Sequence, residues 1–220
     1  MKKGLTELVF ILDRSGSMAG METDTIGGFN ATIEKQKKEP GEAFVSTVLF
    51  DDCMEVLHDR VPLEKIPALT EKEYFARGGT ALVDALGSAI HHIGNVHKYA
   101  RDEDRPEKTI FVITTDGYEN CSRKYRIEQV RQMVERQKGK YGWEFVFLGA
   151  NIDAVETARN YGISESHAAN FVCDEAGVET MYRAQSRIVA NLRCCEPGCT
   201  FDTAWKDEVE EDNRRRGRRR

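Results

Sequence analysis

The feature that most constrains the fold is a repeated alternation between short strand-forming runs and helical patterns. Strand-forming runs occupy residues 8–12, 44–50, 110–113 and 145–148. Between them, apolar residues recur at helical spacing, as in Leu82, Leu86, Ile90 and Ile93. Repetition of strand and helix predicts a Rossmann-like three-layer α/β/α domain with a mostly parallel central sheet. A turn at Asp51-Asp52 followed by 53–57 predicts one antiparallel edge strand.

The 220 residues suit one domain with a tail. The last helical pattern ends near Leu192, so we predict a domain over 1–193 and a C-terminal tail over 194–220. That tail contains cysteines, then an acidic run at 207–212, and then arginines. Clustered like charges without apolar periodicity are typical of disorder, which we expect for the acidic and arginine runs.

No apolar run approaches the about 20 residues that a membrane helix needs. The run at 8–12 stops at Asp13 without a signal-peptide cleavage site. We therefore expect a cytoplasmic protein that makes no membrane contact. In a reducing compartment its cysteines are expected to be free thiols; they are Cys53, Cys121, Cys173, Cys194, Cys195 and Cys199. The last three lack the paired Cys-x₂-Cys spacing of a zinc site, so their role stays open.

Polar side chains follow the strand-forming runs where a parallel sheet places its ligands, at the carboxyl ends of strands. Asp13, Ser15 and Ser17 follow the first run, Thr80 opens the long helix, and Asp116 follows the run at 110–113. All five offer hard oxygen atoms, and none offers sulfur or imidazole. Such donors favour Mg²⁺ or Mn²⁺, with Ca²⁺ less favoured, and they leave room for an outside ligand.

Three segments together resemble the von Willebrand factor type A (vWA) domain. They are Asp-x-Ser-x-Ser at 13–17, Gly-Gly-Thr at 78–80 and Thr-Asp-Gly at 115–117, in the family's order and spacing. The resemblance covers roughly 5–193. The segment Phe-Leu-Gly-Ala-Asn at 147–151 is similar to small bacterial cytoplasmic members, including those of tellurite-resistance gene clusters.

The resemblance implies a metal-ion-dependent adhesion site and no catalysis. Carried over by position, Ser15, Ser17 and Thr80 would bind the ion directly. Asp13 and Asp116 would act mainly through water. A protein partner would supply an acidic side chain to complete the coordination. A plainer interpretation is also available, because serine and threonine often cap helices and Asp-Gly often forms turns.

Two other functions are compatible with parts of the sequence. A Mg²⁺-dependent phosphate-ester enzyme of the haloacid-dehalogenase type needs a second aspartate two residues after the first, where this chain has Ser15. A nucleic-acid-associated factor could use the arginines within 214–220, which hold six of the 32 basic residues. The rest of the chain is more acidic than the net charge of −5 indicates, and the neighbouring acidic run could neutralise the arginines. We expect binding of a protein partner to be the main function.

Overall fold

A computed structural model describes residues 1–195 and 202–216, and it contains one six-stranded sheet in the order β3-β2-β1-β4-β5-β6. Among the described strands only β2 and β3 pair antiparallel, and β3 lies at the sheet edge. The predicted fold class is thus confirmed. The strands are β1 (Lys2–Asp13), β2 (Glu42–Phe50), β3 (Met54–Pro62), β4 (Pro106–Thr115), β5 (Glu144–Ala150) and β6 (Ala168–Phe171).

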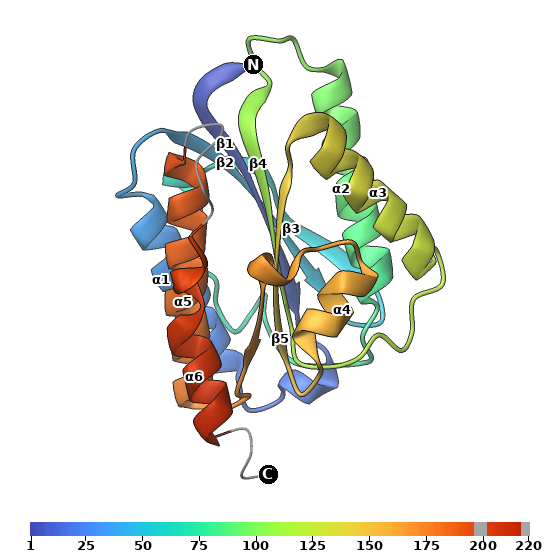
Figure 1. Cartoon of the computed structure of the whole chain (residues 1–220), viewed down its shortest axis with the longest axis vertical. Coiled ribbons are helices and arrows are strands. Elements are labelled where there is room, and N and C mark those ends of the chain that lie inside the picture. Colours follow the sequence, from blue (N-terminus) through green and yellow to red (C-terminus); the bar gives the residue numbers. More distant parts are fainter. Residues whose placement is uncertain (196–201, 217–220) are drawn as a thin grey trace.

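Helices cover both faces of the sheet, with α1, α5 and α6 on one side and α2, α3 and α4 on the other (Figure 1). Their bounds are α1 (Glu22–Gln36), α2 (Leu82–Tyr99), α3 (Ile127–Tyr141), α4 (Ala154–Asn160), α5 (Glu175–Cys194) and α6 (Asp207–Arg216). None of the helices in the described residues has the length and apolar character of a membrane span.

The central strand β1 explains why the layers form. Its neighbours are the parallel strands β2 and β4, so both of its faces are covered by helices. Alternate side chains point to opposite faces of a strand. Leu8, Phe10 and Leu12 join the core beneath α1 and α5, whereas Val9 and Ile11 join the core beneath α2 and α3. All five are at most 1% exposed, which accounts for the continuous apolar run.

The acidic run is helical, so the expected disorder of 207–212 is wrong. Trp205 and Val209 are buried four residues apart, and α6 packs against β6 and α5. The Trp205 indole N–H donates to the Ser166 carbonyl at 3.0 Å. Two apolar residues were too sparse a signal to outweigh so many charges. Cys199 and residues 217–220 lie outside the described residues, and the domain boundary at 193 stays a prediction.

The arginines of α6 pair with acids of the same helix, as the charge pattern suggested. Arg215 contacts Glu211 and Arg216 contacts Asp212, each four residues away. Arg216 also makes a bidentate ion pair with Asp174 at 2.7 and 2.8 Å. Because two of these arginines are already paired, the described part of the tail offers little support for a nucleic-acid contact.

Gly28 determines how closely α1 packs against α5. A Cβ atom at this position would lie 2.0 Å from the Tyr182 ring, whereas one at Gly27 would meet nothing within 4 Å. We therefore expect Gly28→Ala to lower the free energy of unfolding by about 1–3 kcal/mol through overpacking. Gly27→Ala is the matched control, and alanine there should be neutral or stabilise the helix by up to about 1 kcal/mol. Urea unfolding followed by circular dichroism measures both, and equal effects would contradict this account of the packing.

Candidate metal centre

The five sequence-predicted residues lie at the carboxyl ends of the adjacent strands β1 and β4. Asp13 is the last residue of β1, Ser15 caps the short 3₁₀ turn that follows it, and Ser17 lies within that turn. Thr80 lies two residues before the start of α2, and Asp116 comes directly after β4. Segments far apart in sequence therefore meet where the strand order reverses between β1 and β4, the position at which sheets of this type have a crevice.

Hydroxyl and carboxylate oxygens form a connected set in this crevice. The Oγ atoms of Ser15 and Ser17 are 3.0 Å apart. The Ser17 hydroxyl donates to Asp116 Oδ1 at 2.5 Å. A Cβ atom on Gly117 would lie 3.4 Å from Ser17 Oγ and 3.7 Å from Thr80 Oγ1, so both hydroxyls face this glycine. The absence of a side chain at Gly117 keeps that space open.

Asp13 holds the residues around it in place through hydrogen bonds. Its Oδ1 accepts the Ser15 backbone N–H at 2.7 Å, and its Oδ2 accepts the Thr115 hydroxyl at 2.5 Å. The Tyr74 hydroxyl donates to the Asp13 carbonyl. Since both carboxylate oxygens already accept hydrogen bonds, Asp13 is placed to orient Ser15 and to contribute charge.

The loop that carries Thr80 is tied to the first loop and to the segment after Asp116. Gly16 N–H donates to the Gly78 carbonyl at 3.0 Å, and a Cβ atom at Gly16 would lie 3.2 Å from that oxygen. The Thr80 N–H donates to Asn120 Oδ1 at 2.9 Å. The Thr80 hydroxyl makes no hydrogen bond to any described residue, and it is not one of the fully buried side-chain atoms that lack a partner, so it is open to the site.

Two buried carboxylates lie in this crevice, and no basic side chain of the described residues forms an ion pair with them. Asp13 and Asp116 are 2% and 1% exposed, and neither makes an ion pair with any described residue. Burial disfavours the charged form. It raises the pKa of Asp13 to about 6, against the hydrogen bonds from Ser15 and Thr115, and it also raises the pKa of Asp116. The crevice is therefore short of positive charge.

Arg14, the residue after Asp13, belongs to an ion-pair network that the sequence did not predict. Arg14 is 1% exposed, and its Nε donates to Asp51 Oδ2 at 2.8 Å. Arg77 contacts the same oxygen at 2.7 Å, and Glu55 contacts Arg14 Nη1 at 2.9 Å. Burial alone would raise the pKa of Asp51, but hydrogen bonds from Arg77, the Cys53 N–H and Arg14 hold it at about 2.

This network also positions the crevice loops. The Asp51 carbonyl accepts the Ala81 N–H at 2.8 Å, next to Thr80, and the Arg14 carbonyl accepts the Arg77 N–H at 2.8 Å. The sequence indicated only a tight turn at 51–52. Nothing in the pattern suggested that the first aspartate of that turn is buried and paired with the residue after Asp13.

Cys173 was also missed as a neighbour of the site. Its thiol donates to Asp116 Oδ2 at 3.7 Å, from the segment between β6 and α5. The four-residue strand β6 was not predicted, because Ala168–Phe171 carries too little strand signal. With β6 unknown, the chain after it could not be placed beside Asp116.

The donor set fits a hard divalent cation. It consists of three hydroxyls, one of them without a partner, and two carboxylates that lack a counter-charge. Oxygen donors of this kind suit Mg²⁺, Mn²⁺ or Ca²⁺. Among the described residues, no group of three or more histidine, cysteine, aspartate or glutamate side chains is arranged to hold a metal ion. A site at this crevice would therefore depend on hydroxyl ligands.

Comparison with known proteins identifies solved structures with a similar architecture. No family profile matches the sequence, and no curated protein matches it. Among solved structures, proximal thread matrix protein 1 from the mussel byssus is 15% identical, with a TM-score of 0.58 over 85% of this chain and 46% of that chain. A second structure of that mussel protein has a zinc-occupied MIDAS motif and a TM-score of 0.57. A von Willebrand factor type A structure from Catenulispora acidiphila, also 15% identical, has a TM-score of 0.54 over 84% of this chain and 42% of that one.

At this level of identity the likeness concerns the fold. The chain spans less than half of the length of each of these solved chains. Activities, ligands and partners of the longer proteins do not transfer with the fold.

Proposed function

We propose that this chain, which has the von Willebrand factor type A fold, is a divalent-cation-dependent protein-binding module without catalytic activity. The observation that carries the proposal is the pair of buried carboxylates, Asp13 and Asp116, in a hydroxyl-lined crevice with no basic partner among the described residues. Buried charges in proteins are normally paired or coordinate metals. A divalent cation supplies the charge that this crevice lacks.

The residues take the roles that the resemblance implies. Ser15, Ser17 and Thr80 bind the ion directly, and Asp13 and Asp116 act mainly through water. The hydrogen bonds of Asp13 to Ser15 N–H and Thr115 support its indirect role, because both of its oxygens already have donors. Mg²⁺ or Mn²⁺ is the expected ion. When bound, it supplies a Lewis-acidic centre with an open position for a carboxylate of the partner.

Exposed aromatic rings near the crevice support a protein partner. Tyr118, two residues after Asp116, is 64% exposed, and Phe75 is 41% exposed beside Arg77, with the guanidinium carbon 5.1 Å from the ring centroid. Aromatic and arginine side chains are enriched among residues that dominate binding at protein interfaces. An acidic side chain on the partner would reach the ion while apolar groups around it contact these rings.

Metal binding should be visible as stabilisation. With Mg²⁺ at about 100 times its Kd, binding adds about 2.7 kcal/mol to the free energy of unfolding. For a chain of this size that raises Tm by roughly 5–10 °C relative to EDTA. Ser17→Ala should abolish the rise, because it removes one expected ligand. Ser164→Ala, an exposed serine near the amino end of β6, is the matched control and should keep it. Equal melting curves for wild type in Mg²⁺ and EDTA would contradict the metal site.

Affinity capture from an extract of the source cells tests whether the chain binds a protein partner. Wild-type protein should retain a partner in Mg²⁺ and release it in EDTA, and Ser17→Ala should retain none. Captured proteins should lose binding when their own acidic contact residue is replaced by the amide. A partner that stays bound in EDTA with equal affinity would count against coordination as the mechanism.

A further inference from the structure

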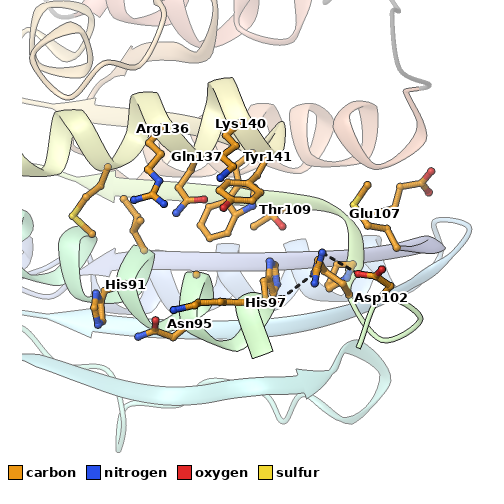
Figure 2. A pocket seen from close by; sticks show the side chains of 18 of the residues that line it. His91, Asn95, His97, Asp102, Glu107, Thr109, Arg136, Gln137, Lys140 and Tyr141 are labelled. Atoms are coloured by element: carbon orange, nitrogen blue, oxygen red, sulfur yellow. Dashed lines mark hydrogen bonds and ion pairs between the residues drawn. The ribbon is translucent and has the colours of Figure 1, made fainter. Parts of the chain in front are cut away.

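A cavity lies near the amino end of β4, whereas the metal crevice lies at the carboxyl end of that strand. It is a groove of about 1040 Å³ between α2 and α3, bordered by the amino-terminal part of β4 and by Trp143 just before β5. Figure 2 shows Arg136, Gln137, Lys140 and Tyr141 on the α3 side of this groove and His91, Asn95 and His97 on the α2 side. Nothing in the proposed metal-dependent function uses it.

The charges that line the groove are unbalanced. Two acids line it: Asp102 pairs with Arg105 at 3.2 Å, and Glu107 accepts the Gly4 N–H at 2.8 Å and keeps its negative charge. The basic side chains of Lys98, Arg136 and Lys140 form no ion pair with any described residue. A groove with an excess of positive charge on an otherwise acidic protein attracts an anion.

Arg136 and Lys140 both influence the neighbouring side chain of Tyr141. They lie four residues apart on one face of α3, and the Lys140 Nζ is 5.2 Å from the Tyr141 ring centroid. Hydrogen bonding by Lys140, with a smaller contribution from Arg136, lowers the pKa of the Tyr141 hydroxyl. Lysines near helix ends also offset the helix dipole, but Arg136 lies a turn further from the end. Both residues are exposed, so their two positive charges are accessible from solvent on one face of the helix.

The floor of the groove offers apolar surface and one unsatisfied donor. Ile90 and Trp143 are 1% and 4% exposed, and Met133 and Tyr125 are half-buried. The Trp143 indole N–H makes no hydrogen bond to any described residue, and it is not one of the fully buried side-chain atoms that lack a partner, so it is open to the groove. Across the groove, the side-chain amides of Asn95 and Gln137 are likewise without partners in the described chain. These donors surround a volume much larger than a lone phosphate needs.

We propose that this groove binds a nucleoside diphosphate, with its phosphates at Arg136 and Lys140 and its base and sugar against the apolar floor. Two phosphates provide the multiple negative charges that the unpaired cations require, and an arginine fork suits phosphate oxygens. The base provides ring atoms for the amides and for the indole N–H. A cavity of this size is in the range of ordinary ligand pockets.

Calorimetric titration of the full chain with ADP tests the proposal, in EDTA so that the metal crevice takes no part. We expect a Kd below about 1 mM, which corresponds to about −4.1 kcal/mol. Arg136→Glu/Lys140→Glu should raise the Kd at least tenfold. Lys35→Glu/Lys38→Glu, the same charge change on and just after α1, is the matched control and should bind normally. Ser17→Ala should also bind ADP normally, which separates this proposal from the metal-dependent one.

A second variant tests the apolar part of the site without changing charge. Gly94 lines the groove, and a Cβ atom there would lie 3.4 Å from Gln137 Nε2, an ordinary contact that the helix tolerates. Gly94→Ala should therefore fold, keep the Mg²⁺-dependent rise in Tm and weaken ADP binding, because the added methyl group occupies the groove. Inorganic pyrophosphate should bind at least about tenfold more weakly than ADP, a difference of about 1.4 kcal/mol. The proposal is overturned by the absence of saturable ADP binding, by equal binding of pyrophosphate, or by ADP binding that survives the charge reversal.

Discussion

Replacing Asp51 with alanine should lower the free energy of unfolding by about 3–5 kcal/mol, because the change leaves a buried guanidinium without its counter-charge. Arg14 and Asp51 have side chains that are 1% and 3% exposed, and their Nε–Oδ2 contact is 2.8 Å. The remaining acid on Arg14, Glu55, is 52% exposed and solvated, so it compensates little. Urea unfolding followed by circular dichroism measures the loss.

The matched control is Glu55→Ala, which removes a carboxylate from the same arginine at the surface. Exposed ion pairs contribute little, so the expected loss is below about 1 kcal/mol. Adding Arg14→Met to Asp51→Ala removes the uncompensated charge and should restore more than half of the stability. If the double variant is as unstable as Asp51→Ala alone, the loss arises from the loop contacts of Asp51 and not from the buried charge.

Asp13→Asn should stabilise the metal-free protein while it abolishes the response to Mg²⁺. The pKa of Asp13 rises from 3.8 to about 6 in the fold, chiefly through burial. A raised carboxyl pKa means that the ionised form destabilises the fold. The contribution of Asp13 to the free energy of unfolding of wild type in EDTA should therefore fall by about 3 kcal/mol as pH rises from about 3 to about 7, and then stay constant.

Asparagine removes this titration, so the variant should be more stable than wild type at pH 8 in EDTA and close to it at pH 4. Unfolding free energies at both pH values, with and without Mg²⁺, measure the two effects together. Asp104→Asn, an exposed aspartate that pairs with Arg101, is the control and should follow wild type. A variant less stable than wild type at pH 8 in EDTA would show that hydrogen bonding by the carboxylate outweighs its burial. Such opposite effects on stability and binding are common at functional sites.

The strand and helix pattern was readable from the sequence where the apolar signal was dense. The strands β1 and β4 are buried on both faces and carry continuous apolar runs, and α2 has a clear apolar stripe. Strand β6 and helix α6 were not readable, since four residues in one case and two apolar residues in the other are weak signals. Both elements are stabilised by contacts with parts of the chain that lie distant in sequence.

The sequence by itself determined the parallel α/β architecture and the five oxygen-bearing residues at the strand ends, because hydrophobic periodicity and local motifs are properties of neighbouring positions. Only the tertiary structure decided that Arg14 faces Asp51 and leaves Asp13 and Asp116 without a cation, and that Arg136 and Lys140 line a groove near the amino end of β4. Burial and charge balance depend on which distant segments meet. Contacts between distant segments cannot be read from the local periodicity of the sequence.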